Sequence, residues 1–401
     1  VMFVVIVLVE IANPTGGTIG HSIAGVRQHL EFIPLFFLGY AFVRTKRALR
    51  TFLMLLLLIA AANGVVSYIQ FNLTPQQLSA WGRGYSQLIS GTDTFSGAGR
   101  NFVDESGRQR VRPPALGSDA GSGGLMGMLA ISGAIALVAL SNRQRNRLIA
   151  VALAAGAVLA ILTSQGRGAL VASVVTLVAF GLLSATTRDR VRVILGAAAA
   201  ALVCYLVISA VLGGTDSGSF RFQRLGPDQL VQSTNESRGD VLGLLVRAAG
   251  DYPLGAGLAT GGPGAGVSGK SALSGTINTE SELSYLVVET GILGLLIIVG
   301  FTLRLLILGF ARCRREPDAE TRLLIAAVVA PLAGVLVLYY PGVVTSSVPI
   351  APYLWAAGGI VSYWLVTRQR MLRDAPPIAG GRETPVRPAP TPPERALAPP
   401  A

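Results

Sequence analysis

The stretch from Ser237 to Gly294 reads SRGDVLGLLVRAAGDYPLGAGLATGGPGAGVSGKSALSGTINTESELSYLVVETGILG and changes character along its length. Its first part is polar and rich in Gly, Ser and Thr, whereas its end is an apolar run that carries a single carboxylate, Glu289. Charged groups at the mouth of a membrane helix are costly, so they usually have a function. The stretch therefore predicts a long polar loop that re-enters a membrane, with candidate functional groups where it does so.

The composition of the whole chain supports a membrane protein. Of its 401 residues, 51% are hydrophobic and only 13% are charged, with a mean hydropathy of +0.57. A soluble globular protein carries roughly 25% charged residues. The net charge of +12 resides mostly in short turns between apolar runs, which is the pattern of the positive-inside rule. We therefore expect a lipid bilayer as partner and no nucleic acid.

Apolar runs recur along the chain at lengths close to the ~20 residues that cross a bilayer. We predict an all-α polytopic protein with about ten transmembrane helices. They lie near residues 1–12, 26–43, 51–69, 124–140, 148–163, 170–185, 193–212, 285–309, 323–340 and 353–367. The first run is too short to span comfortably, so we expect further residues upstream of Val1.

Basic residues follow every second run, which places these turns in the cytoplasm. They are Arg44, Lys46, Arg47, Arg50, Arg143, Arg145, Arg147, Arg188, Arg190, Arg192, Arg312, Arg314, Arg315, Arg322, Arg368, Arg370 and Arg373. The pattern predicts one membrane domain over 1–373, with long extracytoplasmic loops at 70–123 and 213–284. The Pro- and Ala-rich segment 374–401 cannot bury a core and is expected to be a disordered cytoplasmic tail.

Charged side chains collect at the predicted outer ends of the spans. They are Arg27, His29, Glu31, Arg167, Arg221, Arg224, Glu236, Arg238, Asp240, Glu280 and Glu282. The positive-inside rule disfavours arginines on this side of the membrane, so their presence there suggests a function. The guanidinium group binds two phosphate oxygens at once. Several such groups beside one carboxylate would bind a phosphate leaving group next to a general base.

Ordinary roles remain open for the same residues. Arg167, in a Gly-flanked turn, can snorkel to the headgroups, and Arg221 and Arg224 can form a solvated loop face. Arg238 and Asp240 can be a local ion pair at the start of an amphipathic helix, because apolar residues follow at helical spacing.

Two further ionisable residues have competing interpretations. Glu289 lies inside an apolar run, and we expect it to pack against a partner in the bundle rather than to act in catalysis. His29 has the chemistry of a base, but an interfacial side chain is the simpler interpretation.

The segment Gly264-Ala-Gly-Val-Ser-Gly-Lys270-Ser271 fits the phosphate-binding loop of nucleoside triphosphatases. That pattern works only between a buried strand and a helix. Here Gly and Thr precede it, and the predicted topology places it outside the cytoplasm. We interpret the match as chance in a Gly-rich segment, which is better suited to a mobile cover over the site.

In four places the chain resembles the bacterial O-antigen ligase and polysaccharide polymerase superfamily, which acts on lipid-linked glycans outside the cytoplasmic membrane. These places are Gly25-Val-Arg27, Arg112-Pro-Pro-Ala-Leu-Gly-Ser-Asp119, Ser164-Gln-Gly-Arg167-Gly-Ala169, and the segment from Arg238 through Asp251-Tyr-Pro-Leu-Gly-Ala-Gly257 to Glu289-Thr-Gly-Ile-Leu-Gly294. The resemblance implies a multi-pass glycosyltransferase of the bacterial cytoplasmic (inner) membrane, with a cytoplasmic C-terminus. It would move sugar from a polyprenyl-pyrophosphate-linked oligosaccharide donor to a glycan acceptor, without metal or cofactor.

The resemblance also assigns residues. Counting back from the two glycines of Gly291-x-x-Gly294 puts Glu280 where the ligase branch has a His that is thought to activate the acceptor hydroxyl. A carboxylate can accept that proton as well, and the change favours a polymerase of exopolysaccharide or capsule type. By this assignment Glu280 is the base, and Arg27, Arg167 and Arg238 hold the pyrophosphate for an inverting displacement. Arg221, Arg224 and Glu282 are second-rank candidates, followed by Glu236, Asp240 and His29.

Two other classes of function stay open. One is a flippase or transporter of the same lipid-linked glycan, which would place charged groups deep in the spans. The other is a non-catalytic partner in a polysaccharide assembly or export complex.

Overall fold

The computed structural model describes residues 1–14, 16, 18–85, 101–103, 109–117, 119, 121–185, 240–262 and 281–374. The predicted span at 193–212, most of the predicted loop at 213–284 and nearly all of the tail at 374–401 lie outside these residues.

Seven segments within the described ranges are long and apolar enough to cross a membrane. They are α4 (Lys46–Phe71), α7 (Ser122–Ala139), α8 (Gln144–Thr163), α9 (Arg167–Ser184), α15 (Glu282–Arg312) with η2 (Cys313–Arg315), α16 (Ala319–Val329) with α17 (Pro331–Leu338), and α18 (Ile350–Ser362) with η3 (Tyr363–Thr367) and α19 (Arg368–Asp374). The chain is therefore a multi-pass helical membrane protein. Each of the seven corresponds to a predicted apolar run.

The predicted span at 26–43 is wrong as one continuous helix. Helix α2 (Ile19–Leu30) ends before a turn at 31–33, and α3 (Pro34–Phe42) begins after it. Proline lacks a backbone N–H and its ring clashes with the preceding helical turn, so Pro34 favours a new helix start over continuation.

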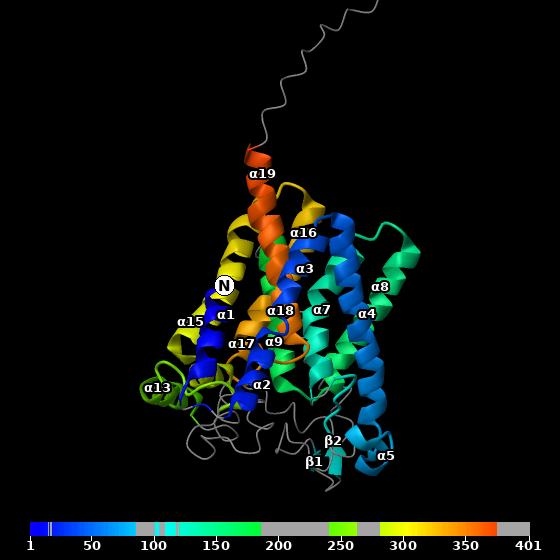
Figure 1. Cartoon of the computed structure of the whole chain (residues 1–401). Coiled ribbons are helices and arrows are strands. Elements are labelled where there is room, and N and C mark those ends of the chain that lie inside the picture. Colours follow the sequence, from blue (N-terminus) through cyan, green and yellow to red (C-terminus); the bar gives the residue numbers. More distant parts are fainter. Residues whose placement is uncertain are drawn as a thin grey trace, which may run out of the picture.

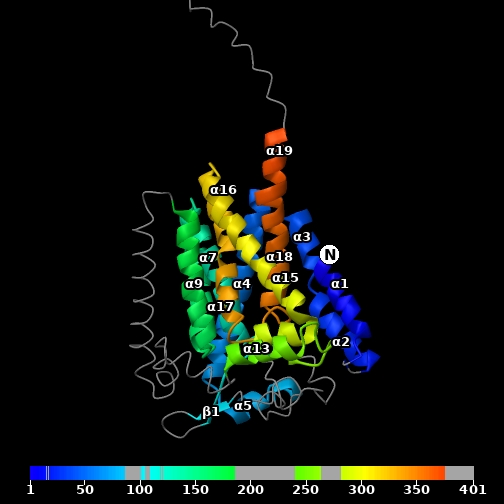
Figure 2. The ribbon, with the colours of Figure 1, turned by 90° about the vertical axis from the view of Figure 1, so that its left-hand side faces the viewer.

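The remaining described elements are short. They are α1 (Met2–Val9), η1 (Glu10–Ala12), α5 (Pro75–Ser79), β1 (Asn101–Val103), β2 (Gln109–Val111) and α13 (Val241–Asp251). The two strands form an antiparallel hairpin with Asn101 opposite Val111, and all other regular elements among the described residues are helical. Figures 1 and 2 show the hairpin and α5 beyond one end of the bundle, with α13 lying across the spans near that same end.

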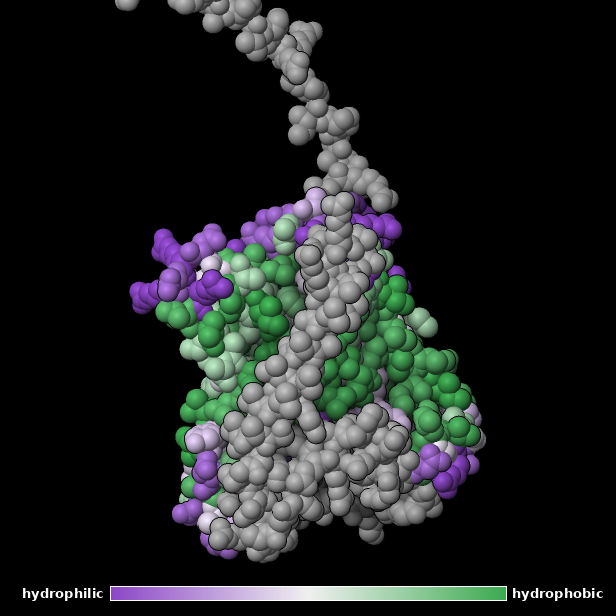
Figure 3. Space-filling view, turned by 180° about the vertical axis from the view of Figure 1, so that it is seen from behind, coloured by the Kyte–Doolittle hydropathy of each residue, from purple (hydrophilic) through white to green (hydrophobic). Residues whose placement is uncertain are grey.

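The two ends of the bundle differ in charge. The connections at 43–45, 140–143 and 316–318 have arginines within them or just beside them. They share one end with α19 (Figure 1), and this end is called the basic end. There Lys46 Nζ lies 2.6 Å from Asp318 Oδ2, joining the start of α4 to the start of α16. Helices α7, α9, α15 and α18 begin at the opposite end, called the loop end. Between the two ends the surface is a band of apolar side chains (Figure 3).

Small residues allow the closest helix pairs to form. A Cβ atom at Gly64 of α4 would lie 1.9 Å from the carbonyl oxygen of Gly156 in α8, and one at Gly39 of α3 would lie 2.3 Å from that of Ala356 in α18. Helices in membranes associate through such small-residue contacts, because lipid removes the hydrophobic driving force between them. These contacts fix α4 against α8, and α3 against α18.

Candidate functional site

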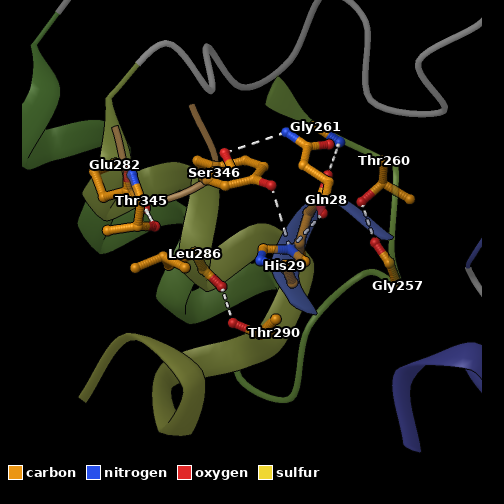
Figure 4. Close-up of polar contacts among 12 residues, drawn as sticks. Gln28, His29, Gly257, Thr260, Gly261, Glu282, Leu286, Thr290, Thr345 and Ser346 are labelled. Atoms are coloured by element: carbon orange, nitrogen blue, oxygen red, sulfur yellow. Dashed lines mark hydrogen bonds and ion pairs between the residues drawn. The ribbon is translucent and has the colours of Figure 1, made fainter. Parts of the chain in front are cut away.

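A buried polar cluster toward the loop end is centred on His29 near the end of α2. Its Nε2 atom lies 2.9 Å from Oε2 of Glu289 and 3.3 Å from the hydroxyl of Tyr285, both on α15. The His29 and Tyr285 rings stack with centroids 5.4 Å apart. Both His29 and Glu289 are buried, and Figure 4 shows α2 delivering His29 to the face of α15. In the tautomer that carries its proton on Nε2, His29 donates this hydrogen bond to the carboxylate oxygen of Glu289.

The second oxygen of Glu289 holds the chain that follows α13. Its Oε1 atom accepts a hydrogen bond of 3.2 Å from the backbone N–H of Gly261. Two more backbone bonds attach the same segment to α15, from Ala256 N–H to the Val288 carbonyl at 2.6 Å and from Ile292 N–H to the Pro253 carbonyl at 3.0 Å. Glu289 thus joins α2, α15 and residues 253–262. The expectation that it packs against a partner in the bundle is confirmed, and the partner is His29.

Helix α15 is broken next to this pair. Gly291 has φ 70° and ψ 179° inside the helix, a conformation that glycine adopts without strain. A Cβ atom there would lie 2.7 Å from the backbone carbon of Leu254 and 2.8 Å from the Pro253 oxygen. The motif Glu289-Thr-Gly-Ile-Leu-Gly294 therefore combines a buried carboxylate with a glycine that lets residues 253–262 approach the helix.

Glu282 is buried, and its carboxylate is surrounded by donors. It accepts hydrogen bonds from the backbone N–H groups of Val344 and Thr345, at 2.5 and 3.0 Å, and from the Thr345 hydroxyl. Its own N–H donates to the carbonyls of Tyr339 and Gly342, each at 3.1 Å. With its oxygens occupied in this way, Glu282 fixes the connection between α17 and α18 against the start of α15, and it is poorly placed to accept a substrate proton.

The other predicted site residues within the described ranges are more open. The Arg27 side chain is 81% exposed and its Nε lies 3.2 Å from Glu31 Oε2. Arg167 is the first residue of α9 and is half-buried. Asp240 caps α13, accepting from the N–H of Gly243 at 3.1 Å. Five predicted residues lie outside the described residues, namely Arg221, Arg224, Glu236, Arg238 and Glu280.

One polar residue that the sequence did not single out lies in the turn between α8 and α9. Gln165 has φ 54° and is only 2% exposed. Its Oε1 atom is buried and has no hydrogen-bond partner among the described residues. Two other described non-glycine residues share the left-handed conformation, Ala115 and Ala259, and each precedes or follows a helix at the loop end. Strained backbone of this kind gathers at functional sites.

No group of three or more His, Cys, Asp or Glu side chains in the described part of the chain is placed to hold a metal ion. A reaction without metal stays a prediction.

Residues 152–299 match the family model of the O-antigen ligase. This segment of the chain is similar to the O-antigen ligase family. It contains α9 with its preceding turn, α13, and the first half of α15, and it confirms the resemblance to the O-antigen ligase and polymerase superfamily. The chain has no match among curated proteins, and none among solved structures.

Two buried carboxylates of the matched segment have partners outside it. Glu289 lies inside the matched segment, but its partner His29 lies outside it, on α2. Glu282 likewise lies inside, and the donors around it come from residues 344 and 345 beyond it. Helix α2 therefore supplies one partner of Glu289, and the connection between α17 and α18 supplies donors to Glu282.

Proposed function

We propose that the chain is a membrane glycosyltransferase that polymerises or ligates a polyprenyl-pyrophosphate-linked oligosaccharide. The product would be a glycan of the exopolysaccharide, capsule or O-antigen type. The observation that carries the proposal is the O-antigen ligase match over residues 152–299. It is supported by the location of that domain's polar turn and buried carboxylates toward the loop end of the bundle.

The positive-inside rule supports a sidedness for this reaction. It makes the basic end cytoplasmic, together with the C-terminal tail, in the bacterial inner membrane. The loop end then faces away from the cytoplasm, where a lipid-linked donor is available after translocation and nucleotide sugars are absent.

The proposed chemistry is direct displacement. A hydroxyl oxygen of the acceptor glycan attacks the anomeric carbon as the bond from that carbon to the pyrophosphate oxygen breaks, which inverts the centre. Glu280 accepts the hydroxyl proton, and the polyprenyl pyrophosphate leaves with the electron pair. Arg27, Arg167 and Arg238 offset the charge that develops on it, assisted by Arg221 and Arg224. Glu280 directly precedes Ser281, the capping residue of α15.

The buried carboxylates have supporting roles in this proposal. Glu289 with His29, and Glu282 with Thr345, hold the two backbone segments that flank residues 263–280. They are positioning residues, since their hydrogen-bonding atoms are already engaged with protein.

The buried His29–Glu289 pair also favours a second function, transport of the same lipid-linked glycan. Ionisable pairs inside a bundle commonly mark substrate or proton pathways. Glu289 lies about 10 Å along α15 from its first residue, at 1.5 Å per residue.

One assay separates the two functions. The purified chain is placed in liposomes with polyprenyl-pyrophosphate oligosaccharide, and free polyprenyl pyrophosphate is measured over time. A glycosyltransferase releases one pyrophosphate lipid per linkage formed, whereas a transporter releases none. Arg167→Ala and Glu280→Gln should abolish release, and Glu320→Gln, which alters only ion pairs at the basic end, should not. Full release by both site variants would refute the assigned roles.

The cellular version of this test uses a strain that lacks the chain. Complementation with Arg238→Ala or Glu280→Gln should give single repeat units and no long polymer on a gel, at wild-type abundance on a blot. Long polymer from both variants would favour the transporter or an assembly partner.

A further inference from the structure

The turn that joins α8 to α9 contains an unusual glutamine. Gln165 follows Ser164, the C-cap of α8, and Gly166 then caps α9. The amide nitrogen of Gln165 lies 3.5 Å from the carbonyl oxygen of Leu162. This weak contact sets the orientation of the amide, because reversing it would bring two acceptor oxygens together. The oxygen Oε1 is left buried and without a partner.

A second buried glutamine shows what a structural role looks like in this protein. Gln70 at the end of α4 has no exposed surface. Its amide nitrogen donates to the Ala115 carbonyl at 3.1 Å and its oxygen accepts from the Ala115 N–H at 2.8 Å. Both the amide nitrogen and the amide oxygen of Gln70 have hydrogen-bond partners within the protein, whereas the amide oxygen of Gln165 has none among the described residues. Buried polar atoms nearly always have a partner, so the free oxygen of Gln165 needs an explanation.

The backbone of Gln165 adds an independent observation. Its φ of 54° is a conformation that a non-glycine residue adopts at a cost. A glycine would remove the strain, and glycine occupies the very next position. The chain therefore retains a strained residue and an unpaired buried amide oxygen at the same place, two residues before Arg167.

The chemistry of an amide oxygen restricts its ligand. An amide oxygen can only accept a hydrogen bond. The oxygens of an ionised phosphate are also only acceptors, so the two groups cannot form a hydrogen bond with each other. The Gln165 oxygen is therefore not suited to binding the pyrophosphate itself, whereas the N–H donors of Arg167 are. Sugar hydroxyls are donors. Cα atoms two residues apart lie within about 7 Å, so a sugar joined directly to a pyrophosphate at Arg167 comes within reach of Gln165.

We propose that Gln165 Oε1 accepts a hydrogen bond from a hydroxyl of the first sugar of the lipid-linked donor. Gln165 is then a substrate-binding residue that distinguishes a glycosylated polyprenyl pyrophosphate from the bare lipid left after transfer. This inference rests on the proposed function, and it adds a reason for the product lipid to leave, since the product lacks the group that Gln165 binds.

Binding to two probes tests the proposal. One is polyprenyl-pyrophosphate oligosaccharide extracted from cells that lack this chain, and the other is polyprenyl pyrophosphate without sugar. Affinities are measured for the full chain in nanodiscs, together with thermal stability. Gln165→Met removes the acceptor at similar volume and should weaken oligosaccharide binding about three- to ten-fold, the effect of one neutral hydrogen bond. Binding of the sugarless lipid should not change.

Two further variants separate ligand binding from strain and folding. Gln165→Gly relieves the backbone and should show the same selective loss without lower thermal stability. Gln70→Met, the matched control, should lower thermal stability and leave the ratio of the two affinities unchanged. Arg167→Ala should weaken both probes.

The outcomes are distinguishable. Wild-type affinities for both probes in Gln165→Met and Gln165→Gly would mean that the buried oxygen holds an ordered water only, and would overturn the inference alone. An equal loss for both probes would also overturn it. A wild-type chain that binds neither probe would overturn the proposed function, and this inference with it.

Discussion

Replacing Glu289 by leucine should strongly destabilise the protein. The substitution removes the acceptor for His29 Nε2–H, at 2.9 Å, and for the backbone N–H of Gly261, at 3.2 Å. A buried donor left without a partner costs about 1–3 kcal/mol, so two such donors give roughly 2–6 kcal/mol. We therefore expect Glu289→Leu to lower the free energy of unfolding by about 3–4 kcal/mol.

A double variant shows whether loss of the contact between His29 and Glu289 causes the destabilisation. His29→Phe together with Glu289→Leu removes one orphaned donor and keeps a ring between Phe3 and Tyr285. Since replacing a buried pair by apolar residues is often close to neutral, the double variant should recover about 1–3 kcal/mol relative to Glu289→Leu alone.

Equilibrium unfolding in bicelles, measured by steric trapping, gives these free energies. Glu31→Gln is the matched control, because it breaks the exposed pair with Arg27 and should cost less than about 0.5 kcal/mol. A loss below about 1 kcal/mol for Glu289→Leu would refute the reasoning. So would a double variant whose loss equals the sum of the single losses, because that would mean no coupling between the two side chains.

Of three further predictions, two use the same measurement and one uses gel filtration. Gly291→Ala should lower the free energy of unfolding by more than about 2 kcal/mol, since it combines φ 70° with a Cβ 2.7 Å from backbone. The control Gly300→Ala meets no atom within 4 Å and should be neutral or stabilising by up to ~1 kcal/mol. Equal effects of the two substitutions would contradict the strained conformation at Gly291. Gly64→Val should prevent α4 from packing on α8, where the Cβ would lie 1.9 Å from a backbone oxygen, and folded protein should be lost on gel filtration; a normal elution profile would contradict this. The hydrogen bond from Lys46 holds the pKa of Asp318 below its usual range. The stabilisation by the Asp318 carboxylate is therefore complete above about pH 4 and is lost as the pH falls further. The difference in free energy of unfolding between wild type and Asp318→Asn should stay constant from about pH 7 to about 4 and shrink below, and a change of that difference near neutral pH would refute the prediction.

The sequence predicted the membrane helices well because their apolar runs are long. It placed their ends less well, and α4 shows why. The predicted run at 51–69 begins after the last basic residue, yet α4 extends from Lys46 to Phe71. Thr45 caps the helix by accepting from the N–H of Ala48 at 3.1 Å, so the helix begins at a polar cap that hydropathy does not register.

The break between α2 and α3 had a readable signal that hydropathy concealed. Pro34 stands in the middle of the predicted span at 26–43, and a proline inside a helical pattern indicates an end or a kink. The apolar residues on both sides gave one continuous run. The structure instead ends α2 just after His29, which leaves that side chain facing α15.

The candidate site was predictable residue by residue but not as an arrangement. His29, Glu282 and Glu289 were each recognisable as ionisable groups at or inside apolar runs. Nothing in their spacing pairs His29 with a residue 260 positions away, since such a contact depends on how the helices pack. Gln165 was missed because glutamine in a polar turn is ordinary; only its backbone conformation and its buried oxygen make it unusual.

The pairing of His29 with Glu289 has a consequence for biogenesis. The ribosome must add 260 residues between the two, which takes about 13–50 s at roughly 5–20 residues per second. Throughout that interval α2 is in or near the bilayer with a polar side chain that has no partner on the nascent chain. We expect α1 and α2 to dock only once α15 has been inserted. Interrupted translation would leave an exposed histidine in the membrane, a feature by which quality-control proteases can recognise an unfinished copy.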